Sequence, residues 1–155
     1  VLGDAQNVLM YRVDIEDFYQ AFLPNGTQFD NCNGFFIVQC TGKNSAWVQI
    51  WGKLRRLALL DSEFDDSENH IAYLAYVDRG VIARNIFSRP AFGRTALRLS
   101  ARTDDFDYPT NNVVISDNQI LGWIDPIIGG SAHADGTRYN WELINLAPNG
   151  PWEQR

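Results

Sequence analysis

Apolar and polar side chains alternate along residues 7–16, and this pattern restricts the fold more than any other feature of the chain. One parity contains Leu9, Tyr11, Val13 and Ile15, and the other contains Met10, Arg12, Asp14 and Glu16. Successive side chains of a β-strand point to opposite faces, so a period of two is typical of a half-buried strand. We therefore expect a strand over residues 7–16 whose first set faces the core.

Other segments carry strand signals as well. Residues 95–102 repeat the alternation, with Leu97 and Leu99 on one parity and Arg98 on the other. Short β-branched or aromatic segments bounded by Gly, Asn or Asp also predict strands, and these are 35–41, 112–116, 119–124 and 139–146. Within residues 70–87, two apolar runs are separated by Asp78-Arg79-Gly80, which predicts a β-hairpin.

Residues 46–60 fit two interpretations. Trp47, Ile50, Trp51 and Leu54 lie at helical spacing. Against a helix, Gly52 lies in the middle of the segment at a cost of about 1 kcal/mol, and Trp, Val and Ile favour strands. We favour a strand to about residue 54, with a helix as the alternative.

The predicted elements indicate one all-β domain over residues 1–155. They comprise roughly eight or nine strands with no βαβ alternation, and we recognise no internal repeat. We expect an antiparallel β-sandwich of jelly-roll type, with a closed, lipocalin-like β-barrel as the alternative.

The two cysteines, Cys32 and Cys40, frame the apolar segment Phe35–Val38. A disulfide needs Cα atoms within roughly 4.4–6.8 Å, whereas an extended segment would carry Cys40 away from Cys32. Unpaired thiols are the favoured interpretation and a 32–40 bridge is the alternative. Asn25-Gly26-Thr27 is an N-glycosylation sequon, which favours an extracellular, secreted location with Asn25 modified.

The charge and the apolar runs restrict the partners. A net charge of −6 opposes the phosphate attraction on which nucleic-acid binding depends. No apolar run reaches the roughly 20 residues that span a bilayer. We therefore expect no nucleic-acid or membrane partner. Arginines concentrated in the middle of the chain suggest contacts with carboxylates of another copy, and hence a homo-oligomer, although pairing with carboxylates of the same chain explains them more economically.

Catalytic motifs are absent from the sequence. His70 and His133 match no zinc-binding spacing, and we find no nucleophile elbow or phosphate-binding loop. We expect neither an enzyme nor a bound cofactor. The one metal for which the sequence offers ligands is calcium, which takes oxygen ligands, and the candidates in the acidic run 61–68 are Asp61, Glu63, Asp65 and Asp66.

A second acidic segment combines carboxylates with rings and suggests a ligand site. Ring faces stack on the C–H faces of sugars, while carboxylates hydrogen-bond to hydroxyl groups. The candidate residues are Asp104, Asp105, Phe106 and Tyr108, together with Trp152 near the end of the chain. We expect a non-catalytic, lectin-like module that binds carbohydrate, or another small-molecule ligand, through loops between strands. The alternatives are a self-assembling subunit of a capsid or appendage, and a cofactor-free barrel enzyme or small-ligand carrier.

Overall fold

The computed structural model describes residues 6–22, 33–91, 94–99, 111–121, 128–130, 140–144 and 147–148. In these ranges the chain forms a 14-stranded sheet and contains no helix. The strands are β1 (Gln6–Tyr11), β2 (Asp14–Phe22), β3 (Asn33–Val38), β4 (Thr41–Leu54), β5 (Leu57–Leu60), β6 (Glu63–Ser67), β7 (Ala72–Ala83), β8 (Ile86–Pro90), β9 (Leu97–Leu99), β10 (Asn111–Ser116), β11 (Gln119–Leu121), β12 (Ile128–Gly130), β13 (Asn140–Ile144) and β14 (Ala147–Pro148).

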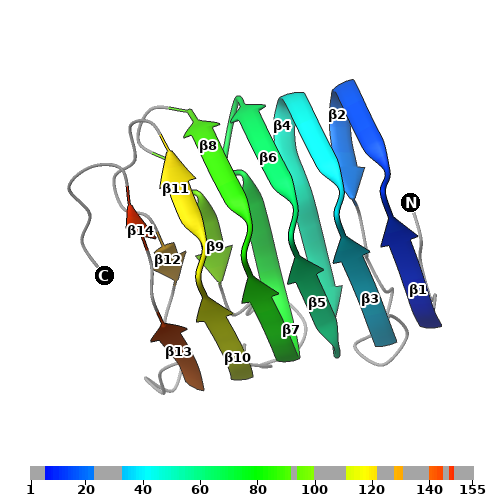
Figure 1. The fold of residues 1–155 in the computed structure, drawn as a ribbon, viewed down its shortest axis with the longest axis vertical. Helices are drawn as coiled ribbons and strands as arrows, with labels where there is room; N and C mark the ends of the chain where they lie inside the picture. The colour runs from blue at the N-terminus through cyan, green and yellow to red at the C-terminus, as the bar shows by residue number, and fades with distance from the viewer. Residues whose placement is uncertain are drawn as a thin grey trace.

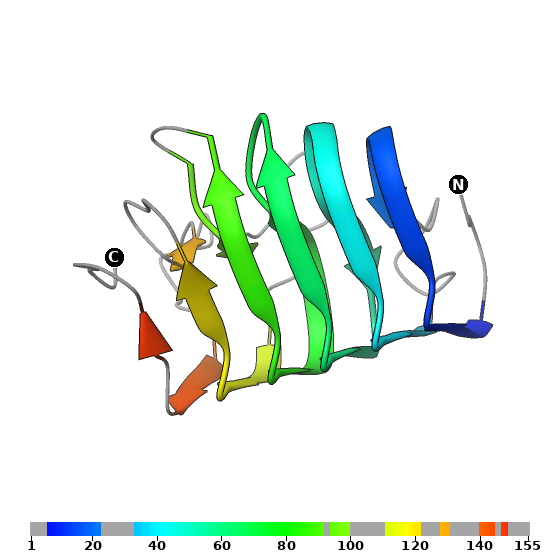
Figure 2. The same ribbon diagram turned by 45° about the horizontal axis from the view of Figure 1, so that its top comes forward.

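Every strand pairing in these ranges is parallel, and the chain winds into a β-solenoid. Figures 1 and 2 show successive coils side by side, from blue at β1 to red at β13 and β14. Face 1 contains β1, β3, β5, residues 80–83 of β7, β10 and β13. Face 2 contains residues 14–18 of β2, residues 41–45 of β4, β6, β8, β11 and β14. Face 3 contains residues 20–22 of β2, residues 50–54 of β4, residues 72–77 of β7, β9 and β12.

The expected antiparallel jelly-roll sandwich and the alternative barrel are therefore both wrong, although the all-β class is right. The expected hairpin within residues 70–87 is wrong for the same reason. β7 runs from Ala72 to Ala83 through Asp78-Arg79-Gly80, and it pairs in parallel with β4, β5, β9 and β10. A turn signal here marks a corner between two faces of one coil, and the chain does not reverse.

The corners share one backbone conformation. All the non-glycine residues with positive φ in the described ranges occupy three columns, one at each corner. The first column contains Asn7, Arg79 and Asn112, the second contains Arg12, Gln39, Asp61, Arg84 and Asp117, and the third contains Asp17, Asn44, Asp66 and Arg89. A left-handed residue costs roughly 1–2 kcal/mol outside glycine, least for Asn and Asp. The stacking of neighbouring coils must therefore hold the arginines and Gln39 in this conformation.

A corner also explains an error in the expected strand over residues 7–16. The left-handed Arg12, with φ of 53°, separates β1 from β2 and reverses the parity of the side chains. In β1, Val8 and Met10 pack against the core, while Leu9 and Tyr11 are 61% and 49% exposed. After the corner, Val13 and Ile15 pack against the core as expected.

The core lies inside the coils and is built from aligned apolar columns. Face 1 stacks Ile37, Leu59, Ile82 and Ile115, all buried. Face 2 contributes Phe64 and Phe87, whose rings stack at 6.0 Å. Face 3 stacks Phe22, Ile50, Ala72 and Leu97. Parallel strands paired in register place similar residues above one another. The apolar surface that each column buries stabilises the fold by about 25 cal/mol per Å².

Residues 46–60 are strand rather than helix, because β4 extends from Thr41 to Leu54 and β5 from Leu57 to Leu60. Cys40 is a buried, free thiol, and its Sγ lies 3.4 Å from the Met10 and Val38 carbonyl oxygens. Cys32 lies outside the described residues. The described part of the chain has no helix with the length and apolarity that a membrane span requires.

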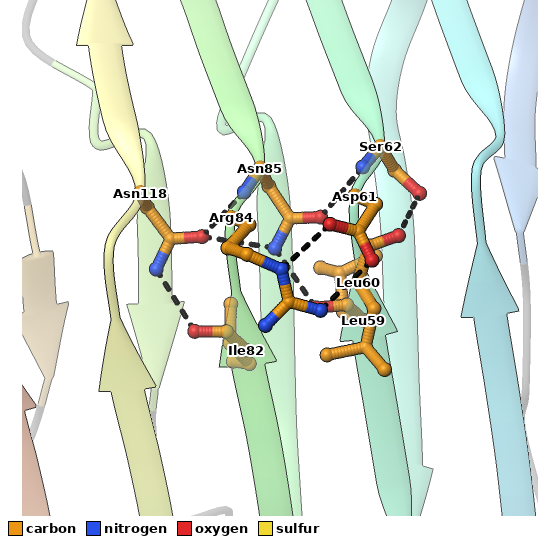
Figure 3. A network of polar contacts seen from close by, with 8 residues as sticks. All are labelled: Leu59, Leu60, Asp61, Ser62, Ile82, Arg84, Asn85 and Asn118. Carbon is orange, nitrogen blue, oxygen red and sulfur yellow. Dashed lines mark hydrogen bonds and ion pairs between the residues drawn. The ribbon is translucent and has the colours of Figure 1, made fainter.

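Polar side chains point inward directly after the second corner and form a column across the coils (Figure 3). The column comprises the buried residues Ser62, Asn85 and Asn118, and the buried Cys40 occupies the equivalent position one coil earlier. The Asn85 and Asn118 amides each donate at 2.8 Å to a carbonyl oxygen of the preceding coil, Leu59 and Ile82 respectively. The backbone N–H of Ser62 donates to Asn85 Oδ1 at 3.0 Å, and that of Asn85 donates to Asn118 Oδ1 at 2.9 Å. This amide column thus satisfies buried backbone groups at the corner and joins adjacent coils.

We predict that Asn85→Ala destabilises the protein by roughly 2–4 kcal/mol, since it leaves the buried Ser62 N–H without its acceptor and removes the hydrogen bond to the Leu59 carbonyl. The measurement is urea unfolding. The matched control is Arg84→Gln at the preceding, outward position, which breaks an exposed ion pair with Asp61 and should cost under about 1 kcal/mol. Equal losses for the two variants would contradict a structural role for the amide column.

Candidate functional site

The loop site expected from the sequence falls outside the described residues. Asp104, Asp105, Phe106 and Tyr108 lie in the range 100–110, Trp152 lies in 149–155, and Asn25 lies in 23–32. The ligand-binding and glycosylation predictions for these residues stay predictions. Along the chain, the segment 104–108 follows β9, a strand of face 3.

Of the four carboxylates proposed for calcium, Asp61 and Asp66 lie at two corners, and Glu63 and Asp65 lie between them in β6. Asp61 accepts two hydrogen bonds from Arg84, at 2.7 and 2.8 Å, at the second corner. Asp65 accepts from Arg89 Nε at 2.8 Å and from the Ser88 hydroxyl at 2.7 Å, while Asp66 lies 3.4 Å from Arg89. The hydrogen bonds from Arg84 and Arg89 lower the pKa of Asp61 and of Asp65. Among the described residues, no group of three or more such side chains could hold a metal ion, so calcium binding stays a prediction.

A different set of side chains lies together on the outward side of face 3. The ladder aligns Trp51 of β4 with Tyr73 of β7, and Tyr73 with Arg98 of β9. All three side chains are half-buried and flanked along their strands by buried residues. The Arg98 guanidinium lies over the Tyr73 ring, 5.2 Å from its centroid. Three adjacent strands thus present an indole, a phenol and a cation in one row, which we call the face 3 row.

His70 lies beside this row, just before β7. Its ring is 5.8 Å from the Tyr73 ring, and its Nε2 is 3.4 Å from Arg98 Nη1. On the other side, the Thr95 backbone N–H donates to Nδ1 at 2.9 Å, and the Thr95 hydroxyl lies 2.7 Å from the same nitrogen. The side chain is only 5% exposed. The two contacts of Nδ1 with Thr95 therefore fix the orientation of the imidazole.

The surroundings of His70 keep its ring neutral. Burial lowers the pKa of His70 most, the charges of Arg98 and Arg94 lower it further, and a weaker backbone interaction with Thr95 opposes them, so that the pKa is about 4. The positive charges near His70 contrast with the net charge of −6 of the whole chain. The face 3 row and His70 thus form a locally positive, ring-lined surface, which can donate hydrogen bonds and stack on an apolar face.

Face 1 offers a second exposed surface of a different kind. Its outward side carries the two columns that begin at Leu9 and Tyr11, and Val81 in the first of them is 42% exposed. Apart from the Tyr11 hydroxyl, these three side chains are apolar. They cannot orient a polar ligand, so the face 3 row is the stronger candidate site.

Sequence reasoning missed the face 3 row because its members are far apart in the chain. Trp51, Tyr73 and Arg98 are separated by 22 and 25 residues, and only the register of parallel coils brings them together. His70 was considered only as a zinc ligand. The available signal was the spacing of 22 or 23 residues between aligned positions, as from Phe35 to Leu57 to Gly80.

We predict that stability falls as the pH is lowered from about 6.5 towards 4, because unfolded His70 takes up a proton that folded His70 excludes. His70→Gln should reduce the slope of the unfolding free energy against pH by up to the equivalent of one bound proton. The measurement is urea unfolding at pH 7, 5.5 and 4.5. Asp61 and Asp65, whose ordinary pKa is 3.8, begin to lose their contribution at about pH 5, but they do so equally in the variant and the native chain, so they cancel from the difference. Identical slopes for the variant and the native chain would show that folded His70 is protonated normally.

Comparisons with known proteins give no information on this site. No protein-family model matches the chain, and no curated protein and no solved structure matches it either.

Proposed function

We propose that this protein is a carbohydrate-binding module and that an extended glycan binds along the outward side of face 3. The observation that carries the proposal is the face 3 row, in which Trp51, Tyr73 and Arg98 occupy aligned positions on three neighbouring strands. The site thus differs from the loop expected from the sequence, while the class of ligand is the same.

The chemistry of the row suits a sugar chain. An aromatic face attracts the C–H face of a pyranose, and the Arg98 guanidinium supplies hydrogen-bond donors to hydroxyl oxygens. Adjacent strands lie about 4.8 Å apart, a spacing comparable with the length of one sugar unit. A linear glycan running across the strands could therefore place successive units over successive members of the row.

The rigidity of the support favours binding by a preformed surface. Ile50, Leu74 and Leu97, which lie next to the row on the same three strands, are buried in the core. Tyr73 is held from two sides, by Arg98 over its ring and by His70 beside it. Side chains that are fixed before binding lose little conformational entropy when the ligand arrives.

We expect Trp51→Ala to weaken glycan binding at least about tenfold, which corresponds to about 1.4 kcal/mol of lost contact. A glycan array would identify a ligand, and isothermal titration calorimetry would measure its affinity for each variant. The matched control is Tyr11→Ala, which removes an exposed ring from face 1 and should leave the affinity unchanged. Equal affinities of the Trp51→Ala variant and the native chain, or no binding to any glycan, would contradict the proposal.

A further inference from the structure

The hydrogen bonds of His70 determine which of its nitrogens carries the proton. The Thr95 backbone N–H is a donor in every protonation state, and it points at Nδ1 at 2.9 Å. Nδ1 must therefore be the acceptor, and a neutral imidazole then has its single hydrogen on Nε2. His70 Nε2–H is consequently a hydrogen-bond donor directed towards Arg98.

Arg98 is also a donor at this point. A guanidinium has five N–H groups and no acceptor, and its Nη1 lies 3.4 Å from His70 Nε2. Two donors thus face each other. Arg98 Nε is in addition buried, and no described residue accepts a hydrogen bond from it. Unpaired buried donors are costly, so this arrangement calls for an acceptor that the described residues do not supply.

The missing acceptor should be negatively charged. Arg98 and Arg94 both place positive charge close to His70. Charge-assisted N–H···O bonds are about 2.8 Å long, and one oxygen can lie at that distance from two nitrogens that are 3.4 Å apart. A carboxylate fits best, because its planar pair of oxygens matches the planar fork of a guanidinium.

We propose that His70 Nε2–H and the Arg98 guanidinium form a carboxylate-binding site at the end of the face 3 row. The identity of the ligand rests on the function proposed above: the glycan is an acidic one that contains uronic acid units. Their carboxylates bind at this pair, while the neighbouring sugar contacts Tyr73 and Trp51. The carboxylate site itself depends only on the geometry of His70, Thr95 and Arg98.

The first experiment uses acetate as the probe of the site. Long-range ¹H–¹⁵N correlation spectra report the ring nitrogens of the two histidines, His70 and His133, and a spectrum of His70→Gln assigns the His70 signals. Acetate should shift the Nε2 signal of His70 in a saturable way, and Arg98→Gln should abolish the shift. Arg79→Gln, which removes an exposed arginine at the first corner, should leave it intact. No acetate-dependent shift, or a shift unaffected by Arg98→Gln, would overturn the carboxylate site.

The second experiment compares an oligouronate, a sulfated oligosaccharide and a neutral oligosaccharide of equal length by calorimetry. We expect the native chain to prefer the oligouronate at least tenfold over the neutral one, and Arg98→Gln to remove this preference while Arg79→Gln keeps it. Equal binding of acidic and neutral glycans would overturn the acidic ligand and leave glycan binding in place. A preference for the sulfated chain would overturn the carboxylate assignment. A response to acetate without binding of any glycan would support the carboxylate site and overturn the proposed function.

Discussion

The structure depends on the in-register, parallel pairing of successive coils. This pairing stacks each inward residue on its equivalent in the next coil, which produces both the apolar columns and the amide column of Ser62, Asn85 and Asn118. The amides are needed because buried backbone N–H groups just after the second corner of a coil donate to side-chain oxygens instead of to the carbonyls of a neighbouring strand. Asn85 accepts from the Ser62 N–H of the preceding coil and donates to the Leu59 carbonyl, so a corner and its stacking partner are stabilised together.

The same register creates the candidate site. Trp51, Tyr73 and Arg98 share no local motif, and they become neighbours only because β4, β7 and β9 pair in parallel. His70 joins them from the connection before β7, where Thr95 orients its ring. The core holds the strands rigidly, while the outward positions can carry any side chain. A row of this kind can therefore be specialised for a ligand without disturbing the columns that support it.

The sequence predicted the strands well and their arrangement poorly, for a physical reason. Alternation reports that a segment is extended, and the strand expected within 95–102 does place Leu97 and Leu99 inside and Arg98 outside in β9. Alternation carries no information on the partner strand, so parallel coils and antiparallel hairpins look alike. At Arg12, a left-handed residue of a type that rarely adopts this conformation forms a corner that no turn signature announces, and at Arg79 the turn signature marks a corner rather than a reversal of the chain. The repeat was hidden because aligned positions are 22, 23 and 33 residues apart from Phe35 to Val113.

The most direct test of the parallel register is a nuclear Overhauser spectrum of the backbone across face 1. Parallel coils place Leu59 opposite Ile82 and Ile82 opposite Ile115, so cross-peaks between the protons of these residue pairs should be present. Contacts between residues 72–77 and 82–87 running in opposite directions, with none between Leu59 and Ile82, would show a hairpin. That result would contradict the solenoid, the amide column and the face 3 row together.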